Sequence, residues 1–299
     1  MTNWQRATIP LPSRLNYCLT LGNTVSHPHI KLPRLIAHRG LSAHAPENTL
    51  SAVRAAHTAG CQWVELDVQL LGDNTAVIWH DRDVNRCSNG RGRLRDMNLA
   101  DAKALDVGSW FSPDFTGERM ATLADMLALL KTLKMGVNLE LKVNRGHDPA
   151  ALAEAAIPVL MKALPSEKYV VSSFSAKALA HARALASTDQ LALGCLFDRV
   201  PSDWQARCQS IQAWSLHANW KKLTQQRARA VSSAGYPLIC FTANDPARFI
   251  PFWKWGTTAV ISDDPTLFSN TSANLPDSHH AESILAAPDE DTSPQIKRR

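Results

Sequence analysis

The sequence lacks the features that mark zinc sites, disulfide frameworks and thiol-redox motifs. Its six cysteines include no Cys-x-x-Cys pair, the spacing on which many zinc and redox sites are built. Cys61, Cys195 and Cys240 lie within or beside apolar strand-like runs, where a free thiol behaves as a small hydrophobic side chain. We therefore expect the protein to work in a reducing compartment.

Long apolar runs are also missing. The segment from Leu15 to Leu21 is interrupted by polar residues, so it does not form the apolar region of a signal peptide. No stretch approaches the roughly 20 consecutive apolar residues that a membrane-spanning helix needs. The sequence therefore predicts a soluble, cytoplasmic protein without a transmembrane segment.

A strong charge of either sign is absent as well. The formal net charge is +5, and residues 269–299 hold five acidic residues against Lys297, Arg298 and Arg299. This small positive excess is compatible with an anionic small-molecule substrate, but it is too small to indicate nucleic-acid binding. Nothing in the sequence indicates an oligomeric state.

Strand-like runs alternate with helical segments over most of the chain. The 299 residues, 45% of them hydrophobic, suffice for one α/β barrel or for two ordinary domains. Near-continuous apolar strands between helices indicate a parallel sheet buried on both faces. The predicted strands begin at Leu35, Trp63, Val137, Tyr169, Leu191, Ile211, Leu238 and Ala259. Eight strand–helix units predict a TIM barrel whose active site lies at the carboxyl ends of the strands.

The predicted barrel covers residues 34–268. One segment within it and the two segments outside it do not follow the strand–helix pattern. Residues 1–33 contain four prolines without periodicity, which predicts an irregular N-terminal leader. Residues 81–121 are rich in arginine and turn residues, and we interpret them as a small insertion, or cap, after the second strand. Residues 269–299 are polar and predict a disordered tail. Three aromatic residues are expected to form a small core within the insertion: Trp110, Phe111 and Phe115.

The second strand leads into an antiparallel hairpin through a Gly-Asp-Asn turn, a common hairpin signal. Centring the turn near Asp73 places His80 opposite Leu66, and therefore level with Glu65 and Asp67. These two acids share one strand face at roughly 6.6 Å and repel by about 2 to 3 kcal/mol at an effective dielectric of about 20. A shared proton, an arginine or a divalent cation could offset the repulsion, and paired oxygen ligands suit Mg²⁺ or Ca²⁺.

Further polar residues fall at the predicted carboxyl ends of the strands. Because these ends meet at one rim of a barrel, their side chains are expected to converge. The converging set would be His38, Arg39, Glu65, Asp67, His80, Glu140 and Lys142. Three more residues at strand ends are candidate substrate-binding residues: Phe174, His217 and Phe241.

The ordered set of motifs resembles the glycerophosphodiester phosphodiesterase family over residues 34–268, and in particular its bacterial cytosolic members. The family signature is His-Arg, then Glu-x-Asp, then His, and here it reads His38-Arg39, Glu65-Leu66-Asp67 and His80. Further matches are Ala45 to Thr49, Leu105 to Phe111, Glu140 to Lys142, Ser172 to Phe174 and Phe241 to Asn244. Two departures are Phe241, where tryptophan is common, and Ala121, where proline is frequent.

The resemblance implies a TIM barrel with an insertion after the second strand, which matches the irregular segment found from the pattern. It also implies metal ligation by Glu65, Asp67 and Glu140, and acid–base catalysis by His38 and His80. The imidazole pKa lies near neutrality, which suits both proton transfers. Two cations, Arg39 and Lys142, would offset the charge of a phosphodiester, although Lys142 could also serve only to neutralise Glu140.

The implied activity is metal-dependent hydrolysis of glycerophosphodiesters, such as glycerophosphocholine or glycerophosphoethanolamine, to sn-glycerol 3-phosphate and an alcohol. The attacking group could be water, or the neighbouring glycerol hydroxyl acting through a cyclic phosphate. Two alternatives are lysophospholipase D-type activity on lysophospholipids and a non-catalytic barrel that binds phosphodiesters. The presence of both histidines and all three acids argues against the non-catalytic alternative.

Overall fold

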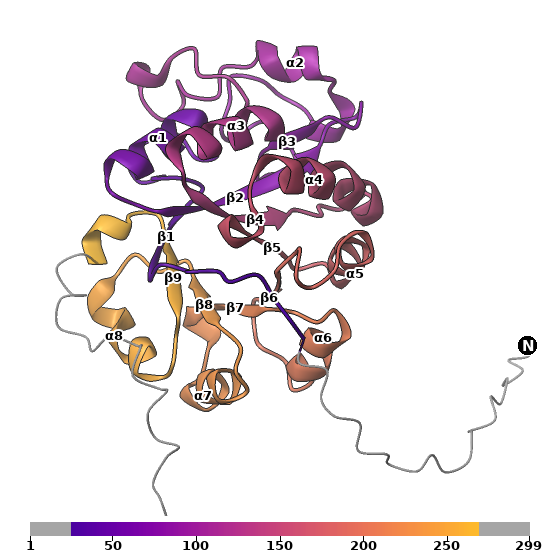
Figure 1. The fold of residues 1–299 in the computed structure, drawn as a ribbon. Helices are drawn as coiled ribbons and strands as arrows, with labels where there is room; N and C mark the ends of the chain where they lie inside the picture. The colour runs from indigo at the N-terminus through magenta and orange to yellow at the C-terminus, as the bar shows by residue number, and fades with distance from the viewer. Residues whose placement is uncertain (1–24, 269–299) are drawn as a thin grey trace, which may run out of the picture.

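The computed structural model describes residues 25–268 and contains a closed barrel of eight parallel strands (Figure 1). The barrel strands are β1 (Leu35–His38), β2 (Trp63–Leu70), β4 (Gly136–Leu141), β5 (Tyr169–Ser173), β6 (Leu193–Phe197), β7 (Ser215–Asn219), β8 (Leu238–Phe241) and β9 (Ala259–Ser262). Pairing of β1 with both β9 and β2 closes the ring. The TIM barrel predicted from the sequence is confirmed.

Helices follow the strands around the outside of the barrel (Figure 1). They are α1 (Leu50–Thr58), α3 (Leu123–Leu133), α4 (Pro149–Ala163), α5 (Ala176–Leu185), α6 (Trp204–Ser210), α7 (Gln225–Ser233) and α8 (Pro246–Lys254). Side-chain caps fix most of their starts, as at Thr122, which forms a reciprocal capping box with Asp125 at the start of α3. Such a box satisfies two backbone amides that the first helical turn leaves unpaired.

The hairpin forms with the predicted register. β3 (Ala76–Ile78) runs antiparallel to β2, and Ile78 lies opposite Val68. Beyond it, the Trp79 amide donates to the Asp67 carbonyl at 2.9 Å. The return strand therefore carries His80 back to the level of the acids on β2.

Two predicted element starts are four residues too early, and a third, at Leu191, is two residues too early because β6 begins at Leu193. β7 begins at Ser215 and not at Ile211, because Ile211 is the C-cap of α6 and the next residue, Gln212, turns the chain with a φ of +49°. The sequence pattern predicts a helix from Lys221 to Ala234, but α7 begins only at Gln225, and Lys221 lies in a separate 3₁₀ turn. Apolar residues such as Ile211 are buried in a turn as readily as in a strand, so burial alone did not locate the boundary.

The insertion, residues 81–121, has a short helix that the sequence pattern did not predict, α2 (Leu99–Ala104). Its core is shared between the hairpin and the insertion and consists of Leu71, Val77, Trp79, Val84, Cys87, Leu94, Ala102, Val107 and Met120. The predicted aromatic core is wrong, because Trp110 and Phe115 only pack edge-to-face against Phe111, and Trp110 stays 38% exposed.

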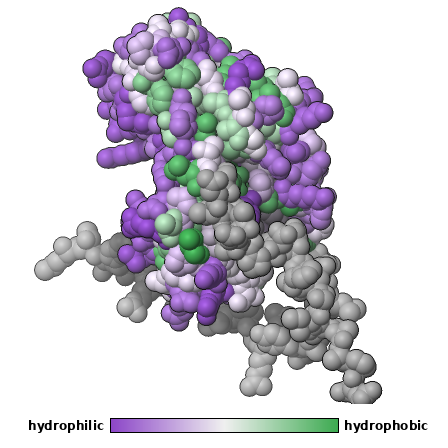
Figure 2. All heavy atoms as spheres, turned by 90° about the vertical axis from the view of Figure 1, so that its left-hand side faces the viewer, coloured by the Kyte–Doolittle hydropathy of each residue, from purple (hydrophilic) through white to green (hydrophobic). Residues whose placement is uncertain are grey.

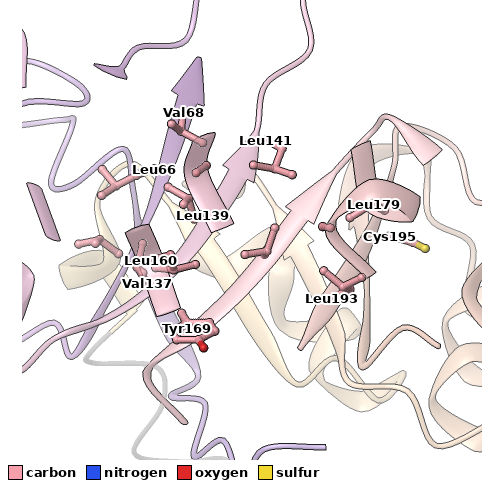
Figure 3. Close-up of a cluster of buried hydrophobic side chains, with 14 of the residues drawn as sticks. Leu66, Val68, Val137, Leu139, Leu141, Leu160, Tyr169, Leu179, Leu193 and Cys195 are labelled. Carbon is pink, nitrogen blue, oxygen red and sulfur yellow. The ribbon is translucent and has the colours of Figure 1, made fainter. Parts of the chain in front are cut away.

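The main hydrophobic core lies between the strands and the helices. Side chains alternate along β2, so that Leu66 and Val68 project outward into this core (Figure 3). Val137, Leu139 and Leu141 of β4 join them in the same cluster (Figure 3). Burial of such a side chain stabilises the fold by roughly 1.5 to 3 kcal/mol. The same alternation turns the acids of β2 inward, toward the barrel axis.

A second apolar cluster fills the barrel at the amino ends of the strands, with Ile36, Trp63, Val170, Ala192, Ile239, Ala259 and Ile261 as its buried members. Ile30 and Leu32 pack against this cluster, since residues 25–33 cross that end of the barrel (Figure 1). Residues 25–33 form neither helix nor strand, and they cover the floor of the barrel. Residues 1–24 and the tail predicted for 269–299 lie outside the described residues.

Hydrophilic side chains cover much of the face that holds α1 and α8, with apolar residues between them (Figure 2). Within residues 25–268, none of the helices combines the length and the apolar character needed to cross a bilayer.

Candidate active site

Three acidic side chains meet inside the barrel near the carboxyl ends of the strands. Glu65 and Asp67 come from β2 and Glu140 from β4, and the strand register places Asp67 directly beside Glu140. All three are buried, and a carboxylate oxygen of each lies within 4.8 Å of the others. The structure therefore brings together the three residues predicted as metal ligands.

The acids differ in how readily they ionise. Burial raises the pKa of Glu65 and of Glu140, and the neighbouring Asp67 charge raises both further. Burial would also raise the pKa of Asp67, but Lys142 and Arg39 overcome this effect and hold it below its ordinary value. The cluster therefore carries one firmly ionised carboxylate between two whose ionisation a further positive charge would favour.

Lys142 and Arg39 lie against the acids, as predicted. The Lys142 Nζ is 2.9 Å from Glu140 Oε1 and 3.2 Å from Asp67 Oδ1, and the Arg39 Nε is 3.3 Å from Asp67 Oδ2. Arg39 has a φ of +56°, a conformation that costs energy outside glycine and often occurs at functional sites. In this conformation the Arg39 amide donates to Glu65 at 3.2 Å.

His38 is fixed by a partner that the sequence analysis missed. Its Nδ1 lies 2.6 Å from Asp263 Oδ1, and Ser42 and Asn244 donate to the same carboxylate. Burial would raise the pKa of Asp263, but the His38 hydrogen bond lowers it to about 2. The contact leaves the His38 Nε2 facing the acids, 3.7 Å from Glu65 Oε2.

His80 has an equivalent partner in its neighbour, since its Nδ1 lies 2.7 Å from Asp81 Oδ1. Asp81 is held by Arg86, whose guanidinium also makes two 2.7 Å bonds to Glu47. Glu47 in turn accepts from Arg39 at 2.7 Å. Burial lowers the pKa of His80, and the nearby cationic side chains lower it further.

The two rings are therefore oriented in the same way. A carboxylate at Nδ1 favours the tautomer that carries its hydrogen there, which leaves Nε2 unprotonated and free to accept a proton. Asp81 could have been identified as the partner of His80 because the two residues are adjacent in the sequence. Nothing in the sequence connects His38 to Asp263, which lies 225 positions away.

One predicted helix start also serves the site. The sequence Pro46-Glu47-Asn48-Thr49 predicts only the start of a helix, and Thr49 does cap α1. Asn48 instead donates to Asp67 Oδ2 at 2.9 Å and accepts from the Asp67 amide at 3.2 Å. It fixes the orientation of the central carboxylate.

The three candidate substrate contacts fall into two groups. Phe174 is 50% exposed at the rim and packs edge-to-face against Phe241, with ring centroids 5.9 Å apart. The Lys142 Nζ lies 6.0 Å from the Phe174 ring. His217, by contrast, is fully buried within the barrel, where its Nε2 lies 2.9 Å from Ser215 Oγ. It is not at a strand end, because β7 continues to Asn219.

An open cavity of about 470 Å³ adjoins the His38 side of this constellation. Its lining includes His38, Arg39, Ser42, Glu47, Asn244 and Asp263. Cavities of this size are typical of small-molecule sites.

Replacing Glu140 with glutamine is expected to stabilise the metal-free protein more at about pH 8 than at about pH 5. Burial and Asp67 raise the folded-state pKa of Glu140 to about 7, so the folded protein retains a proton that the unfolded chain has lost. The stability contribution of this group therefore falls as the pH rises from about 4.5 to about 7.

Urea unfolding in EDTA would measure this effect. The free-energy difference between Glu140→Gln and wild type should grow by about 1 to 3 kcal/mol between the two pH values. Because the comparison is a difference between two proteins, the titration of other groups largely cancels. A difference that stays constant with pH would contradict the raised pKa.

Comparison with known proteins agrees with the geometry. Residues 38–267 match the model of the glycerophosphoryl diester phosphodiesterase family. A glycerophosphodiester phosphodiesterase of Caldanaerobacter subterraneus subsp. tengcongensis is 31% identical, over 79% of this chain and 96% of that protein. One from Bacillus subtilis is 27% identical, over 78% and 84%.

A solved structure shows the same relationship. An Oleispira antarctica phosphodiesterase, determined in complex with the product sn-glycerol-3-phosphate, is 35% identical to this chain with a TM-score of 0.77. The likeness covers 81% of this chain and 97% of the other. The chain therefore belongs to the glycerophosphoryl diester phosphodiesterase family and is a phosphoric diester hydrolase.

Proposed function

We propose that this protein hydrolyses glycerophosphodiesters to sn-glycerol 3-phosphate and an alcohol, with a divalent cation, Mg²⁺ or Ca²⁺, held by Glu65, Asp67 and Glu140. The observation that carries the proposal is the orientation of His38 and His80, each with an aspartate at Nδ1 and a free Nε2. The proposed substrates are small water-soluble molecules such as glycerophosphocholine, and the proposed location is the cytoplasm.

The donor set fits such a cation. Three buried carboxylates supply the oxygen ligands that Mg²⁺ and Ca²⁺ prefer, and two of them have a raised pKa that a nearby positive charge would lower again. When bound, the cation would polarise the phosphoryl oxygen as a Lewis acid.

The protein side chains supply the remaining charge. Arg39 and Lys142 lie on the two sides of Asp67, where they would contact the non-bridging oxygens of a phosphodiester and offset the charge that develops in the transition state. Phe174 and Phe241 would bound the organic part of the substrate, because the Phe174 ring adjoins Lys142 and packs against Phe241.

The two histidines would move the protons. One Nε2 takes the proton of the attacking hydroxyl, and the other ring, protonated, gives its proton to the leaving alkoxide. Asp263 and Asp81 keep the rings in position and stabilise the imidazolium form. Both assignments of acid and base suit this geometry, with either water or the adjacent glycerol hydroxyl as the nucleophile.

Product release from glycerophosphocholine tests the proposal. Purified protein with Mg²⁺ or Ca²⁺ is expected to release sn-glycerol 3-phosphate and choline, detected by an enzyme-coupled assay, and the His38→Ala/His80→Ala double variant should release neither. Absence of product from several glycerophosphodiesters, with either cation, would reject the function.

A second candidate activity, cleavage of lysophospholipids, is favoured by an apolar groove at the rim. The groove between α5 and α6 has a volume of about 410 Å³ and begins at Phe174, the exposed ring beside Lys142. Its lining includes Ala176, Leu179, Ala180, Cys195 and Ile211. An acyl chain attached to a glycerophosphodiester at the rim could extend into this groove.

Filling the groove would separate the two substrate classes. In Ala180→Trp, turnover of lysophosphatidylcholine should fall by about tenfold or more, the scale of a pocket contact, while turnover of glycerophosphocholine should remain within about twofold of wild type. Ala184→Trp, one turn along the same helix, is the control. Equal effects on both substrates, or no wild-type cleavage of the lysophospholipid, would reject this second activity.

A further inference from the structure

A layer of polar side chains lies inside the barrel between the three acids and the apolar floor. In the strand register, Asn138 of β4 sits beside Glu65, and Ser172 of β5 sits beside Glu140. Both are buried, with exposures of 1% and 0%. Because neighbours in a parallel sheet point to the same side, these side chains face the barrel interior together with the acids.

His217 of β7 also borders this layer, across Gly194 of β6. Gly194 of β6 pairs in register with Ser172 and with Ser215. A Cβ atom at Gly194 would lie 2.5 Å from the His217 Nε2. The absence of a side chain at position 194 therefore lets the imidazole lie over β6, next to the strand that carries Ser172.

The polar atoms of this layer lack partners within the protein. Among residues 25–268, no hydrogen-bond partner is found for the Asn138 Nδ2 and Oδ1, the Ser172 Oγ or the His217 Nδ1. Burial lowers the pKa of His217 to about 3, so the ring is neutral, and its Nδ1 must donate or accept one bond. Four such atoms in one layer are unusual, because buried polar groups are nearly always paired with protein or with ordered water.

We propose that Asn138, Ser172 and His217 bind water inside the barrel, and that Asn138 acts through this water as a positioning residue for Glu65 and Glu140. A buried water needs two to four polar partners, and these side chains supply them. Residues that orient metal ligands through hydrogen bonds are as much a part of a metal site as the ligands. The inference rests on the cation site proposed above.

Cation affinity tests the positioning role without measuring turnover. Titration calorimetry with Mg²⁺ should show that Asn138→Leu, which keeps the side-chain volume but removes both polar atoms, weakens binding by about 10- to 100-fold. Asn138→Ser, which keeps a polar group and leaves room for another water, should stay within about threefold of wild type. Thr257→Val, which removes a buried hydroxyl paired with Cys240 on β8, is the control and should match wild type.

These measurements distinguish a positioning role of Asn138 from a general loss of folding, and they test that role independently of the proposed activity. Unchanged Mg²⁺ affinity in a folded Asn138→Leu protein would overturn the positioning role. If that variant does not fold, Ser172→Ala takes its place, with weaker binding expected and unchanged binding overturning the role.

A high-resolution crystal structure of the Mg²⁺ complex should show water within hydrogen-bonding distance of Asn138 and His217, and a dry interior would overturn the water site. A protein that binds Mg²⁺ in this Asn138-dependent way but cleaves no glycerophosphodiester would reject only the proposed function.

Discussion

His38→Ala and His80→Ala are each expected to lower the turnover of glycerophosphocholine by about 10² to 10⁴-fold, the usual contribution of a general acid or base. Each change removes an imidazole whose Nδ1 is held by an aspartate, and the His38 Nε2 lies 3.7 Å from Glu65 Oε2. The effect should fall on kcat more than on KM, because proton transfer belongs to the transition state. Steady-state assays with saturating Mg²⁺ would measure it.

The matched control is His57→Ala. His57 lies exposed in the last turn of α1, so its removal should leave kcat unchanged. Circular dichroism would establish that the active-site variants remain folded. Near-wild-type turnover in both His38→Ala and His80→Ala would show that the acid–base assignment is wrong.

Removal of divalent cations is expected to lower turnover by about 10³-fold, since a Lewis acid contributes several kcal/mol of charge stabilisation at a phosphoryl oxygen. Without the cation, Glu65 and Glu140 remain partly protonated, because burial and Asp67 raise the pKa of both. Dialysis against EDTA, followed by titration with Mg²⁺ or with Ca²⁺, would measure the loss and the recovery.

The Asp67→Asn variant serves as a comparison for wild type in the chelation and cation-titration experiment. Asp67 is the one acid of the three whose pKa is lowered, so it is the carboxylate that is ionised before a cation arrives. The variant should regain little activity at cation concentrations that fully restore wild type. Full activity of the wild-type protein after exhaustive chelation would instead rule out the metal-dependent reaction.

Local sequence signals predicted the barrel because each depends on few residues. The turn around Asp73 determined the hairpin register. Thr122 followed three residues later by Asp125 is a capping-box pattern in the sequence, and it does mark the start of α3. The two largest boundary errors, at Ile211 and Lys221, lie where apolar or helix-favouring residues continue past the end of an element. There, only the actual course of the chain decides which residues are strand, turn or helix.

The convergence of the three acids was predictable for a related reason. A parallel barrel places all strand carboxyl ends at one rim, so Glu65, Asp67 and Glu140 had to approach one another once the strands were counted. His217 was misplaced by the same logic. It was expected at a strand end, but β7 continues to Asn219, so His217 is a buried interior residue and not a rim residue.

The sequence by itself determined the barrel and the chemical types at its rim, because strand periodicity and motif order are properties of short segments. Only the tertiary structure decided how those groups are held. Asp263 reaches His38 across 225 positions, Arg86 joins Asp81 to Glu47, and Gly194 makes room for His217. Such contacts depend on distances between atoms from different βα units, and these distances exist only after the barrel has closed.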